Sequence, residues 1–254
     1  MPVKSIVRVI LLPTLMVILW SILSTYQIVN PVALPNPEAV IKEFWTLLFN
    51  TQLLEHISTS LIRVLMGYSI GSLIGIVLGI FMGLSPRIER MLNMPAAMQR
   101  NIPPVAWIPL AILWFGLGTA PAVFIIMLAT IPPVLINTIV GVRETKIVLY
   151  KAAMTLGIKP NSLTMFSRIT FPAAFPFILN GLRIGIGSAW TGIVAAEMIA
   201  AKSGLGYMLV WGQETLQTPQ IILALLLIGG IGYLFDRGLA KITAKLAFWK
   251  AMEV

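Results

Sequence analysis

The chain has 254 residues, of which 58% are hydrophobic and 11% are charged, and its formal net charge is +9. Soluble domains carry about 25% charged residues, so this composition indicates a protein whose main solvent is lipid. The apolar runs are unbroken, which excludes a β-barrel, whose strands would alternate in polarity. With no cysteine and a single histidine, the sequence excludes disulfides, thiolate chemistry and a histidine cluster for a metal.

Six apolar segments are candidates for membrane-spanning helices, which need about 20 residues each. The third segment is short and is interrupted by Pro104 and Pro109, and a turn that begins at Gly116 separates it from the fourth. We therefore predict an all-α integral membrane protein with about six transmembrane helices. They lie in residues 7–28, 62–84, 104–117, 121–142, 173–200 and 220–240.

The Lys and Arg residues stand at the edges of these segments and predict the orientation of the chain. If the N-terminus is cytoplasmic, most of them fall in cytoplasmic segments, including Arg87, Arg90 and Arg100, whereas Lys42 and Lys202 fall outside. We therefore expect both termini to be cytoplasmic. Because the charges follow the span edges and do not gather on one face, nucleic acid is not expected as a partner.

By composition the chain divides into three parts. Residues 1–30 are predicted to form an N-terminal transmembrane helix that is retained and not cleaved as a signal peptide. Residues 31–60 are predicted to form an extracytoplasmic segment, in which apolar residues recur at three and four from Val40 to Leu48, as in an amphipathic helix. An ordinary packed linker is the alternative for this segment. Residues 61–246 form the core.

Glycine recurs at every fourth position of the second predicted span, on one face of the helix. Small residues on a helix face let two helices approach closely. We therefore expect tight packing along this face, at a seam inside the core or between subunits. The residues are Gly67, Gly71, Gly75, Gly79 and Gly83.

The sequence contains no catalytic constellation. The phosphate-binding pattern GxxxxGK[ST] and the nucleophile pattern GxSxG are both absent. We therefore predict that this chain has no catalytic residues, no metal site and no ATP site of its own.

Five polar or aromatic side chains in the predicted spans are candidates for a transport pathway. Arg183 lies deep in the fifth span, where a charge costs at least about 2.5–3.5 kcal/mol, so it contacts either an anion on the pathway or a partner inside the bundle. Glu197 in the same span has the same two interpretations. Trp107, Trp190 and Asn137 are further candidates, with interfacial anchoring or helix–helix hydrogen bonding as the alternatives.

Residues 143–172 form the longest break between apolar runs and are rich in Lys and Arg, which predicts a cytoplasmic loop. Within this loop Lys151-Ala152-Ala153 and Gly157 resemble the EAA loop of ABC importer permeases, with Lys151 where that family has Glu. The resemblance implies a short cytoplasmic helix that docks on an ATPase subunit through these four residues.

Further motifs resemble the permeases of the nitrate, sulfonate, taurine and bicarbonate importer family. Among them are IPPVAWIPL at 102–110, GLRIG at 181–185 and AAEM at 195–198. The resemblance implies a type I ABC importer permease fold in a bacterial plasma (inner) membrane, with several passes through the lipid. It also implies three kinds of partner: a second permease copy that forms a homodimer, two ABC ATPase subunits that bind ATP and Mg, and an extracytoplasmic substrate-binding protein.

The function implied by this resemblance is ATP-driven import of a small oxyanion of the sulfonate/taurine, nitrate or bicarbonate class. This chain would open and close the central pathway in response to the ATPase. A channel or scaffold subunit without ATP coupling is the alternative, although such a subunit would not need a basic docking helix. An integral membrane enzyme would need a cluster of acids, histidines or cysteines at one membrane face, which the sequence lacks.

Overall fold

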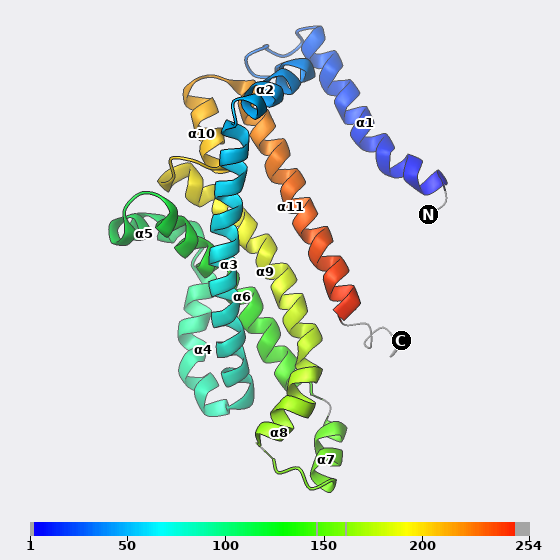
Figure 1. Ribbon diagram of the computed structural model, residues 1–254, viewed down its shortest axis with the longest axis vertical. Coiled ribbons are helices and arrows are strands. Elements are labelled where there is room, and N and C mark those ends of the chain that lie inside the picture. Colours follow the sequence, from blue (N-terminus) through cyan, green and yellow to red (C-terminus); the bar gives the residue numbers. More distant parts are fainter. Residues whose placement is uncertain (1–2, 146, 161, 247–254) are drawn as a thin grey trace. The chain divides into compact units, whose positions relative to one another are not determined.

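The computed structural model describes residues 3–145, 147–160 and 162–246. Within these ranges the chain forms helices joined by loops, without a β-strand, which confirms the predicted all-α class (Figure 1). The helices are α1 (Val3–Thr25), α2 (Pro37–Phe49), α3 (Gln52–Leu84), α4 (Pro86–Asn101), the 3₁₀ helix η1 (Pro104–Trp107), α5 (Ile108–Phe115), α6 (Thr119–Arg143), α7 (Ile147–Thr155), α8 (Leu163–Met165), the π-helix η2 (Phe166–Thr170), α9 (Phe171–Ala200), α10 (Leu205–Glu214) and α11 (Thr218–Leu246).

These helices belong to two compact units. The first unit comprises Met1–Thr59 with Ser203–Gly229, and the core unit comprises Ser60–Lys202 with Gly230–Val254. In the first unit the Thr218 hydroxyl donates a hydrogen bond to the Val32 carbonyl, and the Gly204 amide donates to Nδ1 of His56 at 3.0 Å. Residues 203–229 therefore contact the N-terminal segment and fold with it in one unit. The composition of the chain did not predict this contact.

Among the described residues, four helices are long and apolar enough to cross a membrane, namely Gln52–Leu84, Thr119–Arg143, Leu163–Ala200 and Thr218–Thr243. They correspond to the second, fourth, fifth and sixth predicted spans. The first predicted span lies in α1, of which the part with described side chains, Leu11–Thr25, is a shorter apolar helix.

The third predicted span, 104–117, does not form one crossing helix. It forms η1 and then α5, which together reach only from Pro104 to Phe115. Proline has no N–H to donate and is accommodated in the first turn of a helix, and Pro104 and Pro109 each stand in such a first turn. Gly116 then ends α5 with a φ of 74°, so the segment breaks into two short helices.

The glycine face of α3 packs against α6 inside the core unit. A Cβ atom on Gly67 would lie 2.6 Å from Cβ of Ile126, and one on Gly79 would lie 2.6 Å from Cβ of Thr138. Real Cβ atoms do not approach this closely, so only glycine allows the two helices to lie at their observed separation. The predicted close packing is thus a seam between two helices of one chain.

Replacing Gly79 with Ala is expected to destabilise the protein. The added methyl group forces α3 away from α6, and overpacking of this kind typically costs about 1–3 kcal/mol. The matched control is Gly230→Ala in α11, where an added Cβ meets no described atom within 4 Å. Thermal unfolding of the purified protein in detergent tests this, and equal melting temperatures for the two variants would contradict the seam.

Helices α6 and α9 are in extensive contact within the core unit. Glycines again allow the close approach, because a Cβ on Gly141 would lie 2.6 Å from Cβ of Phe177, and one on Gly181 would lie 2.9 Å from Cβ of Asn137. These two long helices lie side by side (Figure 1) and supply most of the walls of the site described next.

Candidate functional site

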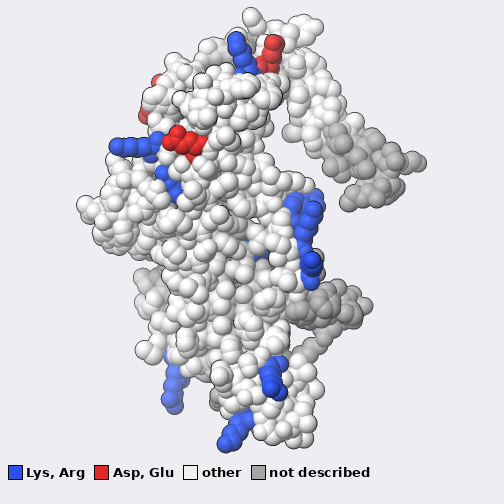
Figure 2. Space-filling view, viewed as in Figure 1, with Lys and Arg blue, Asp and Glu red and all other residues white. Residues whose placement is uncertain are grey.

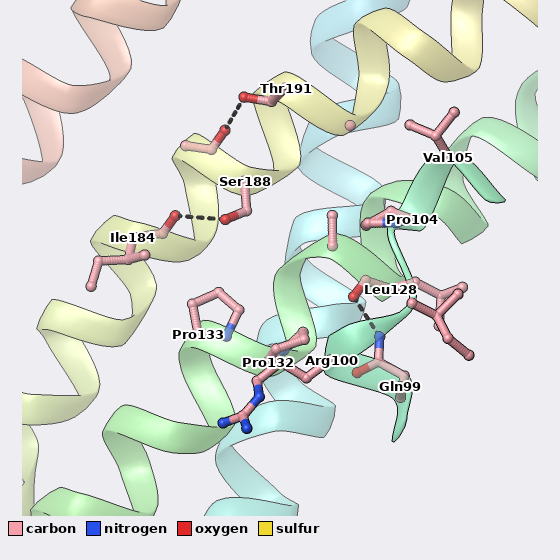
Figure 3. Close-up of a pocket in the computed structure, with 14 residues that line it drawn as sticks. Gln99, Arg100, Pro104, Val105, Leu128, Pro132, Pro133, Ile184, Ser188 and Thr191 are labelled. Atoms are coloured by element: carbon pink, nitrogen blue, oxygen red, sulfur yellow. Dashed lines mark hydrogen bonds between the residues drawn. The ribbon is translucent and has the colours of Figure 1, made fainter. Parts of the chain in front are cut away.

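A cavity of about 630 Å³ lies in the core unit, where α6, α9, η1 and the end of α4 meet (Figure 3). Its α6 and α9 residues come from the middle of these helices, both of which lie in candidate membrane spans. Its walls are mainly apolar, and polar side chains enter from α4 and α9. The lining residues are Gln99, Arg100, Ile102, Pro104, Val105, Leu128, Ala129, Pro132, Pro133, Ile184, Gly187, Ser188, Thr191 and Gly192.

A proline pair in α6 creates one polar anchor of this cavity. Pro132 has no N–H, so the carbonyl of Leu128, one turn earlier, lacks its helical donor. Nε2 of Gln99 donates a hydrogen bond to this carbonyl at 2.9 Å (Figure 3). The bond therefore fixes the end of α4 against the middle of α6.

Arg100 follows Gln99 in the last turn of α4 and lines the same cavity. Positive-inside counting placed Arg100 with the cytoplasmic cations and did not predict that it lines a cavity. Helix α4 has 16 residues, so it runs for about 22 Å and ends beside Leu128. Leu128 lies about 14 Å along α6 from Thr119, in the middle of a candidate span.

Two hydroxyl groups of α9 face the cavity. Oγ of Ser188 donates to the Ile184 carbonyl at 3.3 Å, and Oγ1 of Thr191 donates to the Gly187 carbonyl at 3.1 Å (Figure 3). Each hydroxyl keeps acceptor lone pairs free in this arrangement, and rotation away from its own helix carbonyl would turn its single O–H toward a ligand. The cavity thus combines apolar walls with a few polar groups, as small-molecule sites usually do.

Arg183, the first predicted pathway residue, is not among the residues that line this cavity. Its Nε and Nη2 atoms donate to the two carboxylate oxygens of Asp236 on α11, at 3.0 and 3.1 Å. A partner on another helix, as in one of the two predicted alternatives, is therefore present, and the two side chains of this pair are 41% and 53% exposed. An acid within the sixth predicted span was the signal for it, and sequence reasoning did not use that signal.

Glu197 also has its partners inside the protein. Nη1 of Arg63 on α3 lies 2.8 Å from Oε1 of Glu197, and both side chains are almost completely buried. Oγ of Ser60 lies 2.8 Å from both carboxylate oxygens, and Nε of Arg63 donates to the Thr119 hydroxyl at 3.3 Å. This cluster joins α3, α9 and the start of α6.

The other three predicted pathway residues also lie outside the cavity lining. Trp190 is buried and packs against Phe235 with ring centroids 5.3 Å apart. Asn137 donates to the Pro133 carbonyl at 2.8 Å and accepts from Asn180 at 2.9 Å. Trp107 ends η1, next to the lining residues of that turn, and its Nε1 is buried without a hydrogen-bond partner among the described residues.

Comparison with known proteins decides the family. Residues 71–242 match the model of the binding-protein-dependent transport system inner membrane component. The chain belongs to this family. The permease is therefore a multi-pass subunit of the inner membrane, and it is not an enzyme.

Two relatives and one solved structure are similar to the permease over most of its length. It is 34% identical to the taurine transport system permease protein of Escherichia coli, over 94% of this chain and 87% of that protein. It is 38% identical to the putative aliphatic sulfonates transport permease protein of the same organism, over 89% and 85%. The inward-facing MetNI methionine ABC transporter has a similar fold, with a TM-score of 0.67 and 17% identity over 77% of this chain and 96% of that chain.

The predicted docking residues of the permease lie on and just after α7. Lys151 and Ala152 are exposed, whereas Ala153 is buried. Gly157 has a φ of 83°, its amide donates to the Met154 carbonyl at 3.0 Å, and the Ile158 amide donates to the Ala153 carbonyl at 3.0 Å. This pair of bonds is a Schellman motif, in which glycine takes the left-handed position, so Gly157 has a structural role of its own.

Neutralising Arg183 in the permease is expected to cost stability, because Asp236 then remains as an unpaired charge in a candidate span, at up to about 2.5–3.5 kcal/mol. Arg183→Gln and Asp236→Asn should each lower the melting temperature, and the double variant should recover much of it, since neither charge is left alone. The measurement is thermal unfolding beside uptake of labelled taurine. A stable double variant with no uptake would instead support contact between Arg183 and the substrate.

Proposed function

We propose that the permease carries a small oxyanion of the sulfonate/taurine, nitrate or bicarbonate class inward, with a sulfonate such as taurine as the first candidate. The cavity carries this proposal. It lies at mid-span of α6 and α9, where transporters place their substrates, and it contains Arg100 but no acidic residue among its lining. The relatives named for taurine and aliphatic sulfonates support the same class of cargo.

We further propose that a second copy of the permease closes the cavity as the other half of a homodimer. Ile184, Gly187 and Thr191 of α9 line the cavity and remain exposed in a single chain. Gly187 and Thr191 are small residues of the kind that is enriched where membrane helices pack against one another. An extracytoplasmic binding protein delivers the substrate to this pathway, in keeping with the family.

Two ABC ATPase subunits are proposed to drive the cycle, and the proposal assigns the binding of ATP and Mg to them. The docking element is α7 with the following loop and the start of α8, where Leu156 and Leu163 are 83% and 82% exposed. Exposed apolar side chains of this kind indicate a protein interface. On the face shown in Figure 2, Lys and Arg gather without acids at the end of the core unit that carries α7 and α8, as expected for the cytoplasmic side.

A channel or scaffold without ATP coupling is the alternative function, and one experiment separates the two. The permease is reconstituted in liposomes with its ATPase and its binding protein, and uptake of labelled taurine, ethanesulfonate and nitrate is measured with and without ATP. ATP-dependent uptake of at least one of these anions is expected. Uptake that is equal without ATP would support a channel, and uptake of none of them would refute the proposed cargo.

A further inference from the structure

We infer that Arg100 is the anion-selecting residue of the cavity and that Gln99 holds it in position. This inference rests on the proposed function and names the group that would recognise the cargo. Arg100 is the arginine among the residues that line the cavity, and it differs from three other arginines of the core unit. Arg63, Arg143 and Arg183 each form an ion pair, whereas no described carboxylate pairs with Arg100.

The Arg100 side chain is exposed at the open cavity of a single chain. It lies beside the middle of α6, a candidate membrane span, and a lone charge that faced lipid at that depth would cost at least about 2.5–3.5 kcal/mol. Such a residue persists where it faces water or a ligand. Figure 3 shows the Arg100 side chain beside Pro132 at the cavity wall, where a negatively charged ligand would supply the missing partner.

The chemistry of the guanidinium group fits a sulfonate. Its planar N–H donors match two oxygens of a tetrahedral oxyanion at once. On the opposite wall of the cavity, Ser188 and Thr191 offer hydroxyl groups within the same volume. The apolar residues between them, Pro104 and Leu128 among them, suit the short carbon chain of an alkyl sulfonate better than they suit a fully hydrated ion.

Gln99 is the positioning residue. Its bond to the Leu128 carbonyl anchors the last turn of α4, and the next residue, Arg100, lines the cavity. The proline pair therefore serves the site indirectly, because Pro132 frees the carbonyl to which Gln99 binds. A rigid anchor of this kind reduces the entropy lost when Arg100 binds an anion.

The first test replaces the charge. In proteoliposomes that contain the permease, its ATPase and its binding protein, Arg100→Gln should lower kcat/KM for taurine uptake by about tenfold or more, as expected for loss of a charged hydrogen-bond donor. Arg100→Lys should retain part of the uptake. The control is Arg90→Gln on the same helix, where Nε of Arg90 donates only to the Pro86 carbonyl, and its kcat/KM should match wild type.

The second test restores the charge chemically, because the chain contains no native cysteine. The thiol of Arg100→Cys should react with a cationic methanethiosulfonate and regain uptake, whereas a neutral or an anionic reagent should not restore it. The same reagents on the wild-type complex report any effect on the partner subunits. A thiol that does not react, or equal rescue by all three reagents, would overturn the inference.

The third test separates positioning from folding. Gln99→Met should raise KM for taurine more than it lowers kcat, since Arg100 loses its anchor but not its charge. A purely structural role would instead reduce the amount of active complex and leave KM unchanged. If wild type and Arg100→Gln import taurine equally well, the inference about Arg100 is wrong and the proposed function stands. If wild type imports none of the anions, the proposed function itself is wrong.

Discussion

Arg63→Met is expected to lower the free energy of unfolding by about 3–5 kcal/mol, because it leaves the Glu197 carboxylate buried without its counter-ion. The side chains of Arg63 and Glu197 are 4% and 1% exposed, so water cannot replace the lost partner. In a chain of this size the loss corresponds to a melting temperature lower by about 10 °C. Thermal unfolding of the purified permease in detergent measures it.

The control for this prediction removes both charges. In Arg63→Met/Glu197→Leu no ion is left buried, and apolar replacement of a whole buried pair is often neutral or even stabilising. Most of the lost stability should therefore return. A double variant as unstable as Arg63→Met would contradict the ion-pair account. A stable double variant that no longer imports substrate would show that Glu197 belongs to the pathway after all.

Leu156→Glu, and independently Ala152→Glu, should reduce ATP-driven uptake to a small fraction of wild type and weaken retention of the ATPase. Both side chains are exposed on the proposed docking element, so the new carboxylate remains in water in the permease alone. It becomes buried only when the ATPase binds. Gly157→Glu and Ala153→Asp are less clean variants, because the first strains a left-handed turn and the second places a charge in a buried position.

Co-purification of the ATPase with the tagged permease is the measurement, together with uptake. The matched control is Leu216→Glu, which makes the same change at a side chain that is 76% exposed in the first unit, outside the docking element. It should retain the ATPase. Full retention and full uptake in both Leu156→Glu and Ala152→Glu would remove α7 as the docking element.

Short-range patterns in the sequence predicted the features that depend on local chemistry. Long apolar runs correspond to α3, α6, α9 and α11 because a helix satisfies its own backbone hydrogen bonds in lipid. The four-residue glycine period of the second span predicted a close helix contact, since positions four apart share one face. Residues 104–117 were predicted as one span because they are apolar. They form the two short helices η1 and α5 instead, because their prolines lack the N–H groups that a continuous helix needs.

The tertiary structure alone decided which groups meet. Asp236 lies 53 residues after Arg183, and Glu197 lies 134 residues after Arg63, so no local pattern indicates either pair. Charge counting did not predict that Arg100 lines a cavity, because it takes no account of how α4 packs against α6. Composition and periodicity thus determined that this chain is a helical membrane protein. The packing of α4, α6 and α9 decided which side chains line its cavity, because contacts depend on distance in space and not on distance in sequence.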